Sequence, residues 1–286
     1  MAARHPQDDT GIDVVNAPKD AWSDLYHELL RAPWWLTLLA ISGMVLAVNV
    51  LFAIVYLFTG GIANARPGSF ADAFFFSVQT LGTAGYGWMY PQSRAANVAV
   101  TAESIASIVV VALATGIVFT KFSIPVARLE FARNVVVYLQ DGVRTLAIRL
   151  ANRRGNFIVE AQVRVTFIRG EKTIEGIFFY RLYDLPLVRD RSSAVGRSWL
   201  ILHRIEKGSP FEKLTTTESM RSEDIELGIA INGIDGTTHQ TLHARHRYLP
   251  EDFRFGERFA DMLSLRPDGR LQLDYAKLHD TVQAAY

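Results

Sequence analysis

The sequence predicts a chain in two parts, a helical part with two membrane-spanning helices and an antiparallel β-sandwich that follows it. Two long apolar segments, residues 34–59 and 95–121, are each long enough to cross a bilayer. A shorter apolar run lies between them and leads into the pentapeptide Thr83-Ala84-Gly85-Tyr86-Gly87. Beyond residue 131, apolar and polar residues alternate with a period of two, which is typical of half-buried strands.

We expect three regions within the 286 residues. Residues 1–32 hold a polar tail and an interfacial helix, residues 33–121 form the membrane part, and residues 122–286 form a linker and the β-sandwich. The polar, acidic start of the chain and the length of the first apolar segment indicate that this segment is not a cleavable signal peptide.

Composition excludes several classes of function. The formal net charge is +1, so no nucleic-acid partner is expected. The chain has no cysteine, which excludes disulfides and metal–thiolate sites. The sequence also lacks a nucleophile elbow, a phosphate-binding loop and a zinc-binding helix motif. We therefore expect neither an enzyme nor an organic cofactor.

Residues 20–31 predict a short amphipathic helix with Asp20 as its N-cap. One face collects the apolar side chains, which are Trp22, Leu25, Tyr26, Leu29 and Leu30. A helix of this kind directly before a membrane span is typical of one that lies in the headgroup plane. The alternative is a helix that packs on the soluble part of the chain.

The first span is free of charge, since no charged residue occurs from 32 to 65. Trp34 and Trp35 suit one membrane interface and Tyr56 the other. Asn49 is the one strongly polar side chain of this span, and we expect it to form hydrogen bonds between helices.

The short apolar run predicts a helix over residues 69–81 that is too brief to cross the bilayer. Residues 65–68 form a turn before it, and Ser69 is its N-cap. The carboxyl end of this helix leads toward the pentapeptide, where the helix dipole would favour a cation.

The pentapeptide has the residue types needed to carry a dehydrated cation. Rings of main-chain carbonyls can replace the water shell of such an ion. For successive carbonyls to face one axis, alternate residues must leave the usual backbone conformations, which Gly85 and Gly87 do at little cost. The hydroxyl of Thr83 would add another oxygen at the inner end, and Tyr86 would point away from the ions. One such loop cannot encircle an ion, so several chains must meet.

The second span carries one charge, Glu103, and an ionisable group within a span indicates function. We expect Glu103 to lie behind the pentapeptide and to brace it through hydrogen bonds or an ion pair. The alternative is a solvated carboxylate at the outer surface. Lower in the span, Val111, Thr115 and Phe119 recur every four residues on one helical face, which is either core or the lining of a pore.

Basic residues flank the spans on what we expect to be the cytoplasmic side, and they would meet anionic lipid headgroups. They are Arg31, Lys121, Arg128, Arg133, Arg153 and Arg154. For each of them, an ordinary solvated surface charge is the alternative.

The second half predicts strands at residues 135–139, 145–150, 159–167, 174–181, 199–205, 226–231, 238–248 and 258–265. Turns are predicted at Asp141-Gly142, Asn232-Gly233 and Asp235-Gly236. Short strands with regular turns favour an antiparallel sandwich. His243 and His246 are three residues apart on a strand, so they face opposite sides and do not share a metal ion.

Several of these segments resemble one family, the bacterial inward-rectifier potassium channels. The resemblance rests on the pentapeptide between two spans, on Trp22-Ser23-Asp24-Leu25-Tyr26, and on residues 112–119, 143–152 and 242–246. It covers most of the chain. It implies a homotetramer in the bacterial inner membrane with both termini in the cytoplasm, and an immunoglobulin-like cytoplasmic domain.

The resemblance also implies roles for individual residues. Potassium ions would pass the backbone oxygens of residues 83–87, the selectivity filter. Val111 and Thr115 would line a cavity, Phe119 would close the inner mouth as the gate, and Gly116 would be the hinge. Val111 stands where strong rectifiers carry an acidic residue, so strong rectification through that position is not expected. Anionic lipid would modulate the channel through the interfacial helix and the cytoplasmic domain.

The sequence departs from the family at two points near the filter. Ala84 stands where potassium channels carry Val or Ile, and Trp88 replaces the Asp that is common after the second glycine. A small residue at 84 removes packing behind the filter. A weakly selective cation channel therefore remains an alternative. So does a membrane-anchored binding or sensor module that conducts no ions, because the β domain is more than half of the chain.

Overall fold

The computed structural model of the chain describes residues 21–124 and 128–284. Each of these two ranges forms one compact unit. The first unit is helical and the second is all-β, which confirms the predicted fold class. The expected polar tail at 1–18, the N-cap Asp20, and the side chains of Trp22 and Leu25 lie outside what is described.

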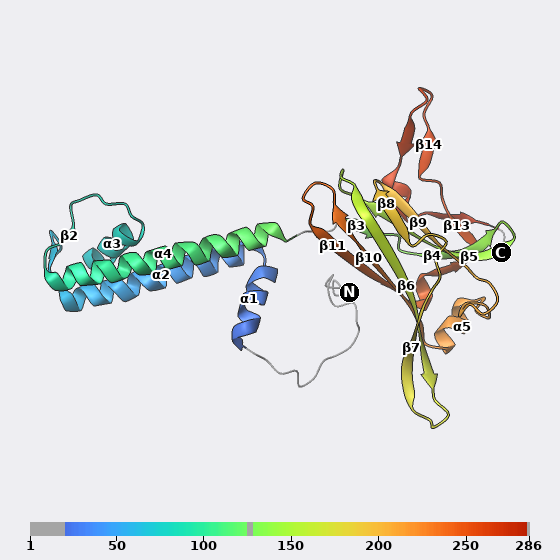
Figure 1. Cartoon of the computed structure of the whole chain (residues 1–286), viewed down its shortest axis with the longest axis horizontal. Helices are drawn as coiled ribbons and strands as arrows, with labels where there is room; N and C mark the ends of the chain where they lie inside the picture. The colour runs from blue at the N-terminus through green and yellow to red at the C-terminus, as the bar shows by residue number, and fades with distance from the viewer. Residues whose placement is uncertain (1–20, 125–127, 285–286) are drawn as a thin grey trace. The chain divides into compact units, whose positions relative to one another are not determined.

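The helical unit contains four helices, which are α1 (Ala21–Arg31), α2 (Trp34–Thr59), α3 (Phe70–Leu81) and α4 (Arg94–Ser123). Figure 1 shows α2 and α4 side by side, with the short α3 packed against both near one end. By length and composition, α2 and α4 are the two described helices able to cross a membrane. The two-residue strands β1 (Ile62–Ala63) and β2 (Tyr90–Pro91) pair antiparallel and join the loops on either side of α3.

Local sequence explains where α3 and α4 begin. The hydroxyl of Ser69 accepts a hydrogen bond from the Asp72 amide, as the N-cap prediction requires, and Ser93 caps α4 through the Ala96 amide. Ala53, Ala73 and Ala99 are buried where the three helices meet, because small side chains let helix backbones approach closely. Most other apolar side chains of α2 and α4 face outward, as expected for surfaces covered by lipid or by other subunits.

Two five-stranded sheets form the sandwich of the β unit. The first has the order β11-β10-β6-β7, and β8 also pairs with β6. Its strands are β6 (Ile158–Lys172), β7 (Phe178–Asp184), β8 (Arg191–Val195), β10 (Ile225–Asp235) and β11 (Thr241–Tyr248). All of its pairs are antiparallel.

The second sheet has the order β12-β4-β5-β3, and β9 also pairs with β5. Its strands are β3 (Leu129–Phe131), β4 (Val135–Gln140), β5 (Val143–Asn152), β9 (Ser198–Arg204) and β12 (Phe253–Phe255). The pair β12–β4 is parallel, which is one departure from the antiparallel prediction. A single core of alternate inward-facing residues such as Ile148, Val165 and Phe167 joins the two sheets.

Part of the segment 257–284 packs on the other face of the second sheet. There β13 (Glu257–Phe259) pairs with β16 (Thr281–Gln283), and β14 (Leu263–Leu265) with β15 (Leu271–Leu273). Phe259 is buried against Val136 and Ala147, and Met262 and Leu278 are buried against Ala151. The short helices are α5 (Thr217–Ser222), η1 (Pro250–Asp252) and η2 (Tyr275–Leu278).

Three local predictions in the β unit are wrong. Residues 174–177 form the turn of the β6–β7 hairpin and not the start of a strand. The segment 258–265 is two short strands, since the chain turns away after Phe259 to bury Met262. Asn232-Gly233 is not a turn but lies inside β10 at a bulge, where a Cβ on Gly233 would be 2.5 Å from Ile158. Close approach of β6 therefore explains that glycine.

Candidate functional site

The pentapeptide follows α3 directly, and its first residues remain tied to that helix. The Thr83 amide donates to the Thr80 carbonyl (3.1 Å), and the Ala84 amide donates to the Gln79 carbonyl (2.9 Å). Ser107 of α4 adds a hydrogen bond from its hydroxyl to the Leu81 carbonyl (2.7 Å). The carboxyl end of α3 is thus fixed to α4 at the point where the loop begins.

Every second residue of the loop adopts a left-handed backbone conformation. The φ angles are +52° at Thr83, +60° at Gly85 and +78° at Gly87. The two glycines tolerate this readily, whereas a non-glycine residue such as Thr83 is disfavoured there by about 1–2 kcal/mol. The sequence predicts this alternation for the glycines but not for Thr83.

The whole loop is exposed in the single subunit, and the side chain of Tyr86 is 78% exposed. Among the described residues, Tyr86 has no hydrogen-bond or ring partner in its own chain. Within the part of the chain that the structure describes, hydrogen bonds hold the loop only at its ends, through α3 on one side and from the Asn64 amide group to the Trp88 carbonyl (2.7 Å) on the other.

The turn before α3 is stabilised by an ion pair that the sequence analysis missed. Both the backbone amide and the guanidinium of Arg66 donate to the Asp72 carboxylate at 2.8–2.9 Å. These hydrogen bonds from Arg66 hold the pKa of Asp72 well below its usual range. The negative charge lies in the first turn of α3, where it complements the helix dipole.

Glu103 is fully buried and joins all three membrane helices. Its carboxyl group accepts hydrogen bonds from the Tyr56 hydroxyl on α2 and from the Ser77 hydroxyl on α3. The Ser77 oxygen also lies 3.0 Å from the Asn49 side-chain oxygen on α2. The complete burial rules out a solvated carboxylate at the outer surface, the alternative given above.

Tyr56 and Ser77 are functional candidates that sequence reasoning did not find. We expected Tyr56 at a membrane interface, and the structure shows a partner that this expectation did not include, because the side chain is 1% exposed and its hydroxyl bonds to Glu103. A phenol within a span finds its most favourable partner in a buried acceptor. The hydrogen bond between Asn49 and α3, by contrast, follows the prediction for that residue.

Val111, Thr115 and Phe119 all lie exposed along α4, with the Phe119 ring 71% exposed in the single subunit. They are therefore not core residues of this subunit. Gly116 lies inside an uninterrupted α4, and nothing occupies the space where its Cβ would be.

Lys121, expected at the lipid surface, is instead 9% exposed. Its ammonium group donates to the carbonyls of Leu29 (3.1 Å), Leu30 (3.3 Å) and Ala32 and to the Thr37 hydroxyl (2.7 Å). These carbonyls form the carboxyl end of α1, where a cation is favoured. Because its hydrogen-bond donors are already used within the chain, we correct the expectation that Lys121 meets lipid.

Two further basic residues also have partners within the chain. Arg153 pairs with Glu130 (2.8 Å), and Arg154 pairs with the buried Asp235 (3.3 Å). Arg31, Arg128 and Arg133 are exposed. In the β unit, the side chain of His243 contacts Asn232 (2.7 Å), whereas His246 stacks on Phe131.

Comparison with known proteins decides the family. Residues 129–286 match the family described as "Inward rectifier potassium channel C-terminal domain", and residues 43–123 match "Ion channel". The chain is 39% identical to the inward rectifier potassium channel Kirbac3.1 of Paramagnetospirillum magnetotacticum, over 96% of this chain and 93% of that one. The chain belongs to the inward rectifier potassium channel family. The family resemblance found in the sequence is confirmed.

Relatives of this inward rectifier in animals are less similar. The human G protein-activated inward rectifier potassium channel 1 is 32% identical over 79% of this chain, which spans 46% of that relative. The mouse G protein-activated inward rectifier potassium channel 3 is 31% identical over 91% of this chain and 72% of that relative. The inward rectifier described here is therefore a membrane channel with two candidate spans and a cytoplasmic all-β domain.

Proposed function

We propose that four copies of this chain conduct potassium ions through a filter formed by residues 83–87. The observation that carries the proposal is the left-handed backbone at Thr83, Gly85 and Gly87. Alternation of this kind lets successive carbonyls face one axis and coordinate a dehydrated cation. The exposure of the whole loop in one subunit supports its completion by neighbouring subunits.

The hydrogen bonds around Glu103 support a bracing role for this residue. Ser77 belongs to the helix whose carboxyl end leads into the filter, and Tyr56 belongs to the outer helix α2. Glu103 would transmit the position of both helices to the filter through hydrogen bonds, not through an ion pair.

The proposed gate lies at the inner end of α4. Four exposed Phe119 rings would form an apolar constriction that closes by excluding water. Val111 and Thr115, on the same face, would line the cavity above it. Gly116 would permit α4 to bend when the gate opens.

We also propose that anionic lipid modulates the channel in the bacterial inner membrane, with both termini in the cytoplasm. Arg31, Arg128, Arg133 and Arg153 are exposed basic residues that support contact with headgroups. Lys121 would act differently, because it connects α4 to the end of α1.

Ion flux into liposomes that contain the purified protein tests the proposal. We expect potassium flux that barium blocks and that greatly exceeds sodium flux. Equal permeation of the two ions would instead favour a weakly selective cation channel, which Ala84 motivates. In that case Ala84→Val, which adds packing behind the filter, is expected to restore selectivity. Absence of flux in every lipid would leave a binding or sensor module.

A further inference from the structure

The cytoplasmic β unit contains an open cavity of about 630 Å³ that none of the roles above uses. Arg169, Tyr183 and Asp184 of the β6–β7 hairpin line one side. The segment after β9, residues 204–214, lines the other. The volume falls within the range of about 300–1,000 Å³ that is usual for small-molecule sites. We call this cavity the β6–β9 pocket.

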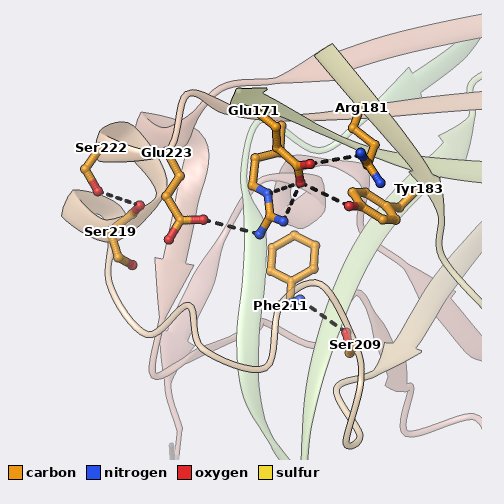
Figure 2. A network of polar contacts seen from close by, with 9 residues as sticks. Glu171, Arg181, Tyr183, Ser209, Phe211, Ser219, Ser222 and Glu223 are labelled. Carbon is orange, nitrogen blue, oxygen red and sulfur yellow. Dashed lines mark hydrogen bonds and ion pairs between the residues drawn. The ribbon is translucent and has the colours of Figure 1, made fainter. Parts of the chain in front are cut away.

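The hairpin side of the β6–β9 pocket is held by a polar network, most of which Figure 2 shows. The Glu171 carboxylate accepts hydrogen bonds from Arg169 (2.8 Å) and from the Tyr183 hydroxyl (3.0 Å), and it pairs with Arg181 (2.9 Å). Arg169 also reaches Glu223 at 3.5 Å. This side is therefore fixed before any ligand arrives.

The opposite side is anchored near the carboxyl end of its loop. Phe211 is fully buried in the core of the sandwich, and the Arg144 guanidinium donates to the carbonyls of Glu212 (3.2 Å) and Leu214. At the base of the pocket, His203 contacts the Pro186 carbonyl through Nδ1 (2.7 Å) and the Ser209 hydroxyl through Nε2 (2.8 Å). Since the carbonyl only accepts, Nδ1 carries the proton and Nε2 accepts from Ser209.

Each carboxylate that lines the β6–β9 pocket already has a donor. Asp184 accepts from Thr166 (2.9 Å), Glu206 pairs with Arg204 (3.3 Å), and Glu212 accepts from the Gly208 amide (2.8 Å). Glu223 pairs with Arg169, as stated above. In contrast, the ammonium groups of Lys207 and Lys213 make no hydrogen bond or ion pair with any residue in the described ranges 21–124 and 128–284. The lining holds four basic and four acidic side chains, and Lys207 and Lys213 are its two charged hydrogen-bond donors that remain available to a ligand.

We propose that the β6–β9 pocket binds a small molecule that carries phosphate, held by Lys207 and Lys213. A phosphate group offers several acceptor oxygens and up to two negative charges, which match two unpaired ammonium groups. Such a ligand could be a soluble phosphate compound or the phosphorylated headgroup of a lipid, because both offer the same chemistry. The experiment below distinguishes these two sources.

Isothermal titration calorimetry on the full chain in detergent micelles tests this site. Inorganic pyrophosphate is the soluble probe, and inositol trisphosphate is the headgroup probe. We expect saturable binding of at least one probe, weakened about tenfold or more by Lys207→Gln with Lys213→Gln. The control is Lys172→Gln with Lys277→Gln, which removes the same charge from exposed positions outside the pocket and is expected to bind like the unmodified chain.

Each outcome has a defined meaning. Binding of pyrophosphate indicates a soluble ligand, and binding of inositol trisphosphate alone indicates a lipid headgroup. The site would be overturned if both double variants bound the probes with the same affinity. It would also be overturned if sulfate bound as tightly as the probes, or if neither probe released or absorbed heat. Unchanged thermal unfolding of the variants shows that they are folded. Because binding is measured without ion flux, this result is independent of whether the channel conducts as proposed.

Discussion

The hydroxyl of Ser77 on the short helix α3 donates a hydrogen bond to the buried carboxyl group of Glu103 on the span α4. The Ser77 oxygen also lies within hydrogen-bond distance of the Asn49 side-chain oxygen. Asn49 donates its amide protons to the Val45 carbonyl (2.8 Å), so its oxygen faces Ser77. One hydroxyl proton therefore has two acceptors.

This geometry predicts that Glu103→Gln is tolerated. The glutamine oxygen would accept from Tyr56, and its amide would donate to Ser77, which frees the serine proton for Asn49. Glu103→Ala leaves two buried hydroxyl groups without their partner, at a cost of about 1–3 kcal/mol each. We expect a near-normal unfolding temperature and potassium flux for the Gln variant. For the Ala variant we expect a lower unfolding temperature and a reduced flux. Equal loss in the two variants would show that the charge itself is required.

Gly85→Ala is expected to abolish potassium flux. No atom of the same chain would contact the new Cβ, and the left-handed backbone at φ +60° is one that alanine disfavours by about 1–2 kcal/mol. Gly43→Ala is the matched control, because its Cβ would also meet nothing and Gly43 lies within the helix α2. Normal flux through the Gly85 variant would contradict the role of the backbone conformation.

Phe119→Ala is expected to raise basal flux several-fold, because the smaller side chain leaves the inner mouth open to water. Flux into liposomes without added regulator is the measurement. The nearby Phe122→Ala serves as control, since the Phe122 ring packs at a tilt against Trp34 of α2 within the same subunit. If a folded Phe119 variant conducts like the unmodified channel, the constriction lies elsewhere.

Lys121→Met is expected to release the end of α1 from α4. The substitution keeps the length of the side chain but removes charge-assisted hydrogen bonds to main-chain carbonyls, each about 1.5–3 kcal/mol. Faster amide hydrogen exchange in α1, with α3 unchanged, is the expected result. Lys172→Met, on the exposed end of β6, controls for the loss of a lysine. Unchanged exchange in α1 would mean that the lysine does not hold it.

His203 predicts a pH dependence of the β domain. Burial lowers the pKa of its imidazole below the ordinary value of about 6.5. The unfolded chain therefore binds this proton more readily, so the contribution of His203 to stability is complete above about pH 6.5 and is lost as the pH falls below it. Thermal unfolding of the full chain on either side of that pH should show this slope. His203→Gln should flatten it, and an unaltered slope would assign it to other groups.

Much of the helical architecture follows from local signals. The apolar lengths of α2 and α4 and the serine at the start of α3 are sufficient to predict these elements. The partners of a buried group are set by tertiary packing instead. Nothing near Tyr56 in the sequence indicates that its hydroxyl meets Glu103, 47 residues away.

The same distinction explains the error at Lys121 and the misread glycine in β10. A lysine at the end of a span is typical of a residue that contacts lipid headgroups. Only the position of α1 shows that its ammonium group instead donates hydrogen bonds within the chain. Asn232-Gly233 has the composition of a tight turn, but Gly233 serves the close approach of Ile158. Composition predicts what a residue can do, and the neighbouring strand or helix decides which option is used.

Among residues 21–124 and 128–284, the loop of residues 83–87 finds hydrogen-bond anchors only at its two ends. In the proposed tetramer, the middle of the loop would take its shape from the neighbouring subunits, so one misfolded loop would disturb all four. In a cell that makes both intact chains and Gly85→Ala chains, the fraction of potassium current lost should therefore be much larger than the fraction of chains that carry the substitution. Inheritance of such a lesion would be dominant.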